Sequence, residues 1–151
     1  MQKETTQSKK ASTPDLTHSD IIEIILEDHK PLKQLIKVMK DSDKDFAERK
    51  SAFEEFAPAL MAHAKPEEQI LYTTLKADDD LREKGFESDV EHSLANQLVE
   101  ECQRTDDKDL LGARIKVLAE LVEHHIEEEE SSLLPDFKKH SDLHERAQMG
   151  N

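Results

Sequence analysis

The chain is poor in the residues that build β-sheets and tight turns. Among its 151 residues there are three glycines, no tryptophan and one tyrosine, and aromatic residues make up 4%. Strands favour β-branched and aromatic residues and need turn residues between them, so this composition argues against a sheet. A chain of this length has room for one domain with a modest core. The sequence therefore predicts a single all-α domain.

Cysteine and long apolar segments are also scarce. Cys102 is the single cysteine, so no disulfide can form within the chain, and nothing indicates an oxidising compartment. The first twenty residues lack the apolar core of a signal peptide, and no apolar run is long enough to span a bilayer. We therefore expect a soluble cytoplasmic protein.

Positive charge is in short supply. The chain has 21 lysines and arginines against 35 aspartates and glutamates, which gives a formal net charge of −14. Duplex DNA and anionic membrane surfaces repel a protein this acidic. The charge balance therefore predicts neither a nucleic-acid partner nor a membrane partner.

Three short polar segments separate four apolar-periodic stretches. These segments are DSDKD at 41–45, KADDD at 76–80 and RTDDKD at 104–109. Clusters of Asp and Ser cap helices and form turns. The sequence therefore predicts an up-down-up-down four-helix bundle, in which Asp80 and Glu83 form nearly a capping box at the start of the third helix.

The two ends of the chain differ from this bundle. Residues 1–16 are polar and show no periodicity, which is typical of a disordered leader. The bundle is expected over 17–142, and residues 143–151 form a polar tail that we expect to fray, beginning near His140.

Three prolines, Pro31, Pro58 and Pro66, fall inside predicted helices. An interior proline costs roughly 3 kcal/mol and kinks the helix axis. Because the apolar pattern continues through each proline, the helices are predicted to be continuous there.

Each predicted helix has one face on which buried residues recur every three or four positions, as in the seam of a bundle. Histidine interrupts this seam in every helix, and in two helices a glutamate follows four residues later. The seam residues are Ile22, Ile25, His29, Leu32, Ile36 and Met39, then Phe53, Phe56, Leu60, His63, Glu67, Ile70 and Thr74, then Ser88, His92, Ala95, Val99 and Cys102, and finally Leu111, Ile115, Leu118, Val122, His125, Glu129 and Ser132.

The polar seam residues follow an internal repeat. The segments beginning at His63 and His125 both read HxxxEExxL. His29 precedes His63 by 34 residues (63 − 29), and His92 precedes His125 by 33 (125 − 92). Two antiparallel hairpins related by such a repeat bring four histidines and two carboxylates to a similar height in the bundle.

A buried charge must be paired or bound to a metal, and imidazole with carboxylate is a ligand set suited to iron or manganese, with zinc also open. The predicted metal ligands are His29, His63, Glu67, His92, His125 and Glu129. Two alternatives stand beside this prediction. His124 and Glu128 also fit HxxxE, although the seam favours His125 and Glu129, and a metal-free bundle could let its histidines satisfy one another.

The pattern H…HxxxE…H…HxxxE over roughly residues 18–140 resembles the hemerythrin and HHE cation-binding family. The opening segment from Asp20 to His29 is similar to the first-helix signature of that family. The resemblance implies two iron ions, bridged by Glu67 and Glu129 and by a solvent-derived oxo or hydroxo group. One iron would be bound by His29 and His63, and the other by His92 and His125.

One position departs from the oxygen-carrying members of the family. Those proteins place a second histidine one turn after the third-helix ligand, where this chain has Asn96. One iron would then lose a nitrogen ligand, so stable O₂ carriage is less expected than reaction with peroxide or NO. Asn96 could hydrogen-bond a bound water. Glu68, Glu91 and Tyr72 lie near the predicted site, and Glu68 and Glu91 are expected to be solvated.

The sequence and its resemblance to this family leave three functions open. The leading hypothesis is a diiron protein that binds or senses O₂, NO or peroxide. The alternatives are a diiron enzyme acting on one of these molecules, in defence against oxidative or nitrosative stress, and a protein of iron storage or transfer. The sequence identifies no protein partner.

Overall fold

The computed structural model describes residues 20–150, and every regular element in that part of the chain is helical. The all-α prediction is confirmed there, and the predicted leader at 1–16 lies outside the described residues. Among residues 20–150, no helix has both the length and the apolar character needed to cross a membrane. The elements are α1 (Ile21–Lys40), α2 (Phe46–Pro66), η2 (Glu67–Leu71), α3 (Tyr72–Ala77), α4 (Arg82–Arg104), α5 (Lys108–Glu128), η3 (Glu129–Leu133), α6 (Leu134–Lys139) and α7 (Leu143–Met149).

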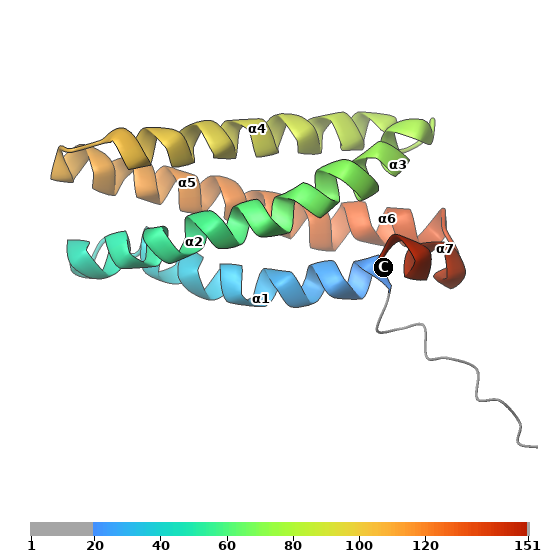
Figure 1. Cartoon of the computed structure of the whole chain (residues 1–151), viewed down its shortest axis with the longest axis horizontal. Helices are drawn as coiled ribbons and strands as arrows, with labels where there is room; N and C mark the ends of the chain where they lie inside the picture. Colours follow the sequence, from blue (N-terminus) through green and yellow to red (C-terminus); the bar gives the residue numbers. More distant parts are fainter. Residues whose placement is uncertain (1–19, 151) are drawn as a thin grey trace, which may run out of the picture.

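The long helices lie side by side along the molecule (Figure 1). Helix α1 packs against α2 and α5, and α4 packs against α5 and α3. Helix α2 continues without a break through the π-helical turn η2 into α3, and α5 continues in the same way through η3 into α6. The rod made by α2, η2 and α3 crosses from α1 towards α4, so it connects the two halves of the bundle (Figure 1).

The structure has a break at each of the three polar segments, but only the first matches its predicted bounds of 41–45. The second break is 78–81 and the third is 105–107, because the helices extend into both predicted segments. The helices also run through Pro31, Pro58 and Pro66, as predicted. The capping prediction at Asp80 was wrong, because α4 is preceded by Leu81 and has no side-chain cap. Asp78 forms the turn instead: its carboxylate accepts a hydrogen bond of 2.9 Å from the backbone N–H of Asp80.

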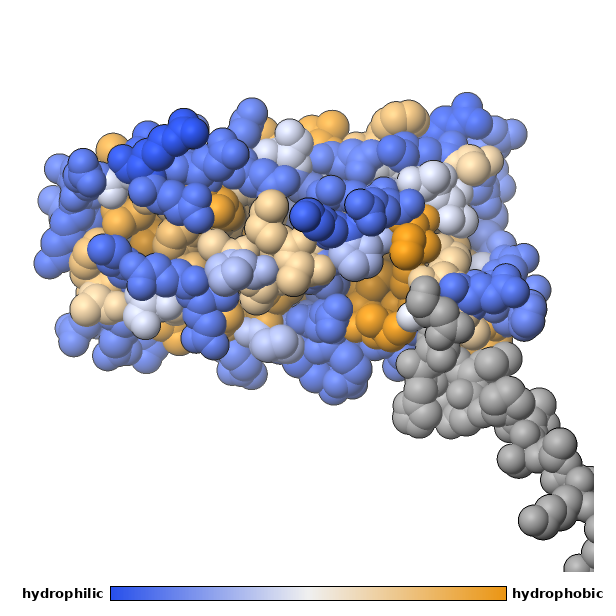
Figure 2. All heavy atoms as spheres, viewed as in Figure 1, coloured by the Kyte–Doolittle hydropathy of each residue, from blue (hydrophilic) through white to orange (hydrophobic). Residues whose placement is uncertain are grey.

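Two apolar clusters fill the interior, with a layer of polar side chains between them. The first cluster includes Phe56, Ile115 and Leu118, and the second includes Leu71 and Phe137. Hydrophilic residues cover most of the outer surface, while a band of hydrophobic residues shows between α4 and α2 (Figure 2).

The C-terminal segment is a helix rather than a frayed tail. Asp142 caps α7 by accepting a hydrogen bond of 2.8 Å from the backbone N–H of Glu145. Arg146 is buried and donates from Nε to Asp20 Oδ2 at 3.0 Å, while its Nη1 donates to the Ser141 carbonyl oxygen. Asp20 also caps α1, so one carboxylate fastens α7 to the start of the first helix.

Candidate metal centre

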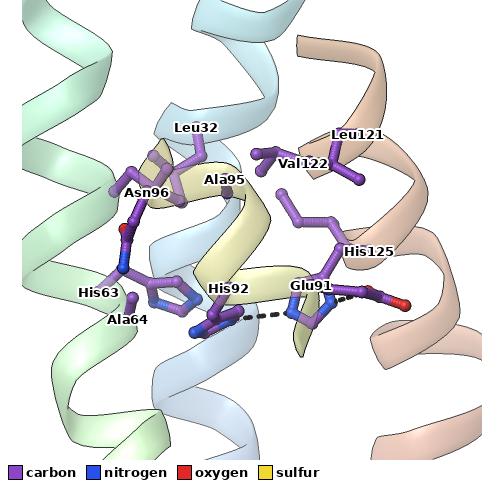
Figure 3. A pocket seen from close by; sticks show the side chains of 12 residues that line it. Leu32, His63, Ala64, Glu91, His92, Ala95, Asn96, Leu121, Val122 and His125 are labelled. Carbon is purple, nitrogen blue, oxygen red and sulfur yellow. Dashed lines mark hydrogen bonds and ion pairs between the residues drawn. The ribbon is translucent and has the colours of Figure 1, made fainter. Parts of the chain in front are cut away.

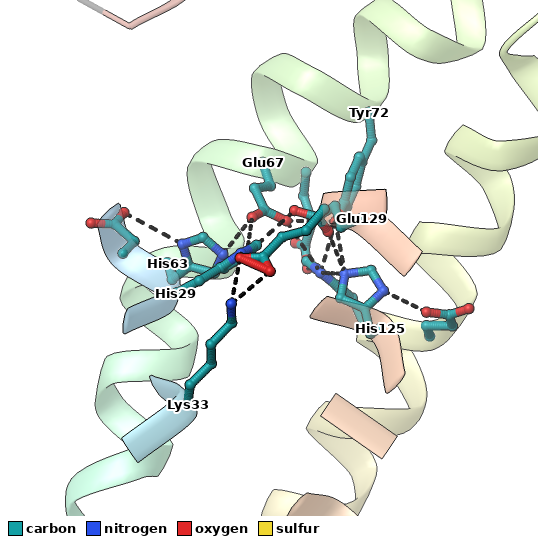
Figure 4. A network of polar contacts seen from close by, with 12 residues as sticks. His29, Lys33, His63, Glu67, Tyr72, His125 and Glu129 are labelled. Atoms are coloured by element: carbon teal, nitrogen blue, oxygen red, sulfur yellow. Dashed lines mark hydrogen bonds and ion pairs between the residues drawn. The ribbon is translucent and has the colours of Figure 1, made fainter. Parts of the chain in front are cut away.

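The six side chains that the sequence singles out converge in the polar layer between the two apolar clusters (Figure 4). Five of the six are buried, with His29 0%, Glu67 2% and Glu129 1% exposed, and His63 is partly buried. By contrast, His124 and Glu128 are exposed and pair with each other at 3.2 Å. The alternative register for the fourth predicted helix therefore points away from the centre.

The first group of possible ligand atoms joins α1, α2 and the two π-helical turns. It consists of His29 Nε2, His63 Nε2, Glu67 Oε1 and Glu129 Oε1, all within 4.8 Å of one another. His29 Nε2 lies 3.5 Å from Glu129 Oε1 and 3.9 Å from Glu67 Oε1, and His63 Nε2 forms a close ion pair with Glu67 Oε1.

The second group uses the other oxygen of each glutamate. Glu67 Oε2 lies 3.5 Å from His92 Nε2, and Glu129 Oε2 lies 2.7 Å from His125 Nε2. The two histidine nitrogens are 3.0 Å apart. Each glutamate therefore faces both groups, with one carboxylate oxygen towards each.

Three atoms of this centre have no hydrogen-bond partner among the described residues: His29 Nε2, Glu67 Oε1 and Glu129 Oε1. A buried polar atom left unpaired costs about 1–3 kcal/mol, and more if it is charged. The ion pair of Glu67 Oε1 with His63 does not have hydrogen-bond geometry, so it leaves that oxygen unsatisfied. All three atoms belong to the first group, where they could be satisfied together by one cation. The nitrogen and carboxylate donors are also those that hold iron or manganese. The residues therefore fit a metal centre.

Tyr72 adds a donor that the sequence pattern did not predict. Its hydroxyl oxygen lies 2.5 Å from Glu67 Oε2, 2.9 Å from His92 Nε2, 3.1 Å from His125 Nε2 and 3.0 Å from Glu129 Oε2. A phenol has one proton to donate, so it cannot satisfy all four atoms. Neighbouring donors around an octahedral ion at about 2.1 Å lie about 3 Å apart, which is close to this spacing.

Comparison with known proteins agrees with this geometry. A family model described as the hemerythrin HHE cation-binding domain matches residues 20–137. The chain belongs to the hemerythrin HHE cation-binding family. No curated protein and no solved structure matched the chain. The resemblance found in the sequence is therefore confirmed, and the two His/Glu groups are its candidate cation sites.

In this hemerythrin HHE domain a carboxylate from a neighbouring helix contacts the outer nitrogen of every histidine in the centre. Such contacts fix the ring orientation and raise the basicity of the nitrogen that faces a metal. They follow the internal repeat, because the residues before His29 and His92 and those after Glu67 and Glu129 supply them. The Nδ1 contacts are Glu130 to His29 at 3.2 Å, Asp28 to His63 at 3.4 Å, Glu68 to His92 at 3.0 Å, and Glu91 to His125.

The expectation that Glu68 and Glu91 are solvated is met only in part, because their side chains are 36% and 23% exposed but contact His92 and His125. Their positions next to a seam residue suggested an exposed face, but their side chains reach across to the histidines of the neighbouring helix. One of these four carboxylates has a further partner: Lys33 donates to both oxygens of Glu130 at 2.7 and 2.6 Å (Figure 4).

The electrostatics of the centre are those of two carboxylates brought too close together. Burial and the neighbouring Glu129 raise the pKa of Glu67. Burial would also raise the pKa of Glu129, but the imidazoles of His125 and His29 hold it well below its usual range. Burial opposes protonation of His125, yet its hydrogen bonds to Glu129 and Glu91 outweigh this and raise its pKa to about 10. The protein alone must therefore neutralise these carboxylates with protons, which a metal cation could replace.

Burial and the charges of Glu129 and Glu67 also raise the pKa of the Tyr72 phenol. The phenol is therefore neutral at physiological pH unless a nearby cation stabilises the phenolate.

The two π-helical turns begin at the two shared glutamates, Glu67 and Glu129. A π-helical turn adds a residue to the helix, and such turns are frequent at functional sites. Beyond each glutamate, the buried positions are shifted by one from the predicted seam. Leu71, Tyr72 and Leu75 are buried where Ile70 and Thr74 were predicted, and Leu133 is buried in place of Ser132. This shift carries Tyr72 into the centre.

A small hollow opens beside the histidines (Figure 3). Its volume of about 20 Å³ is room for about one water-sized molecule. Asn96 lies on its wall, where His63, His92 and His125 also contribute their edges. The remaining walls are mostly apolar, from Leu32, Leu60, Ala64, Ala95, Leu121, Val122 and Ile126.

Proposed function

We propose that this protein binds two iron ions in an up-down-up-down bundle and uses them to bind or sense O₂, NO or peroxide. The observation that carries the proposal is that Glu67 and Glu129 each present one oxygen to both ligand groups. His29 and His63 would complete one iron site, and His92 and His125 the other. Two ions at adjacent sites need shared anionic ligands, because their positive charges repel each other.

Tyr72 would be a further ligand of the site formed by His92 and His125. Oxygen carriers have a histidine at the position of Asn96, and Tyr72 approaches the same site from the opposite hairpin. Tyr72 would take the place of that missing nitrogen donor. Iron, when bound, supplies the redox chemistry that none of these side chains can perform alone.

The apolar hollow indicates that the ligand is a small neutral molecule. It reaches the edges of three histidines, and its size favours a diatomic molecule or peroxide over an organic substrate. Its apolar walls exclude water, while the carboxylates on the outer nitrogens keep the histidine rings aimed at the metal positions. The cytoplasm is the location we propose, on the basis of the single cysteine.

An enzyme is the second candidate, and Tyr72 is the observation that favours it. A phenolate oxygen is a hard, anionic donor, which stabilises the oxidised state of iron more than an imidazole nitrogen does. Such a site would favour turnover of peroxide over reversible O₂ binding.

Metal content tests the proposal first. The purified protein, reconstituted anaerobically with ferrous salt, is expected to hold two irons per chain and to change its absorption reversibly on oxidation and reduction. His125→Ala should lose iron, whereas the matched control His124→Ala, one residue away and exposed, should not. No bound iron in the wild type, or equal binding by both variants, would contradict the diiron site, and many irons per chain would indicate storage.

A further inference from the structure

A second hollow reaches the metal centre from another direction. It lies between α4 and the junction of α5 with η3, and it has a volume of about 300 Å³. His125 and Glu129, which belong to the centre, form part of its wall. The apolar hollow and this acidic hollow are therefore two separate approaches to the same pair of residues.

The walls of the acidic hollow carry carboxylates at increasing depth. Glu87 and Glu128 are exposed, Glu91 is 23% exposed, and Glu129 is 1% exposed. Glu129 Oε2 lies 2.7 Å from Nε2 of His125, the other residue of the centre on this wall, while the unpaired Oε1 faces His29 on the far side of the carboxylate. The cation on this wall, Lys84, is paired with Asp136 and donates to Ser132 Oγ at 2.8 Å.

A hydrated divalent cation and a neutral diatomic molecule need different routes. Apolar walls would strip the cation of its water without offering replacement ligands. Carboxylates at successive depths replace that water step by step and raise the local cation concentration. The polar hollow between α1 and α7 does not provide this, because its walls are acidic but none of the six proposed ligands lines it.

We infer that the acidic hollow is the port through which a divalent cation enters and leaves the centre, with Glu87 and Glu128 at the rim and Glu91 as the step before Glu129. This inference rests on the proposed metal centre. It separates the path of the cation from that of the small neutral ligand, and Glu91 lies on the wall between them because it lines both hollows.

The chain contains its own reporter for a kinetic test. Tyr72 is the only tyrosine and there is no tryptophan, so the intrinsic fluorescence comes from a residue inside the centre. Quenching of this fluorescence after rapid anaerobic mixing with ferrous or cobaltous ion gives the rate of binding. Release is followed by mixing the loaded protein with a chelator.

The double variant Glu87→Gln/Glu128→Gln should bind and release the ion about threefold to tenfold more slowly at low ionic strength. Its equilibrium affinity and final stoichiometry should remain those of the wild type, since both residues lie outside the ligand set. Salt at about 0.5 M should remove most of the difference, because it screens exposed charges. The matched control Glu54→Gln/Glu55→Gln removes the same charge from an exposed part of α2 and should bind at the wild-type rate.

Two results would overturn the port. Equal slowing in both double variants would show that net charge alone sets the rate. Faster cation binding by Leu121→Ala, which widens the apolar hollow, would place the route there instead. A failure of the metal centre itself looks different, because the wild type would then show no stoichiometric quenching.

Discussion

At the scale of single residues, the centre departs from its internal repeat at Tyr72. The equivalent position in the second half, five residues after Glu129, is Leu134. The phenol therefore belongs to one of two otherwise matching ligand groups. The contribution of Tyr72 to metal binding can therefore be measured separately from that of the shared glutamates.

Replacing Tyr72 by Phe should remove the phenolate-to-ferric absorption in the visible region and weaken the second iron selectively. We expect about tenfold weaker binding there, with the first iron retained, because the ring keeps its packing and loses only the donor oxygen. Absorption spectroscopy with iron titration measures both effects. An unchanged ferric spectrum would mean that Tyr72 only donates a hydrogen bond to the centre.

A substitution at Glu68 tests whether the carboxylates that contact the outer histidine nitrogens strengthen metal binding. Glu68→Gln should weaken metal binding about tenfold to a hundredfold, because the amide is a poorer acceptor for the Nδ1 proton of His92. Competition with a chelator measures the affinity. Glu83→Gln, an exposed change on α4, is the control, and equal affinities for both variants would show that Glu68 has no such role.

At the scale of elements, α7 is held by one buried ion pair. Arg146→Met should lower the free energy of unfolding by about 3 kcal/mol, because it leaves the buried Asp20 carboxylate without its cation. Urea denaturation measures this loss. Adding Asp20→Asn, which keeps the cap on α1, should recover much of it, and a double variant no more stable than the single one would refute the explanation.

The sequence predicts the elements well because periodicity and polar breaks are local signals. The four predicted seams agree with the structure up to Glu67 and Glu129, and the three breaks lie within two residues of their predicted bounds. The seams fail beyond those residues because a regular helical period was assumed, while the π-helical turns add one residue each. That local change is why six side chains of the centre were predicted as ligands, while Tyr72 was expected near the site without a role as a ligand.

Helix α7 was missed for a different reason. Its residues are mostly polar, and its burial depends on Arg146 meeting Asp20, which lies 126 residues earlier in the chain. The cross-helix contacts of Glu68 and Glu91 are likewise tertiary. A single sequence carries the spacing of residues along a helix but not these pairings between helices.

At the scale of the whole molecule, the centre is an unfavourable polar layer inside an otherwise apolar interior. It places two buried carboxylates and several unpaired atoms between two apolar clusters. Any cation that binds the folded state alone stabilises it by mass action.

Iron removal should therefore lower the melting temperature. At a free metal concentration 100 times the dissociation constant, bound iron adds about 2.7 kcal/mol to the free energy of unfolding. Thermal denaturation of the iron-free and iron-loaded protein, followed by circular dichroism, tests this. Magnesium, which prefers oxygen ligands and retains its water, is the control and should have little effect. Equal melting temperatures with and without iron would contradict a metal inside the bundle.

The single phenol, in a centre built from two repeated halves, would also make the two proposed iron sites electronically unequal. With one oxidised and one reduced ion, the extra positive charge should settle beside Tyr72, and the electron beside His29 and His63. Mössbauer spectroscopy of the half-reduced protein would then show two distinct, trapped valences. A metal centre built from two repeated halves would thus have one side that gives up an electron and one side that accepts it, and a single side chain would account for the difference.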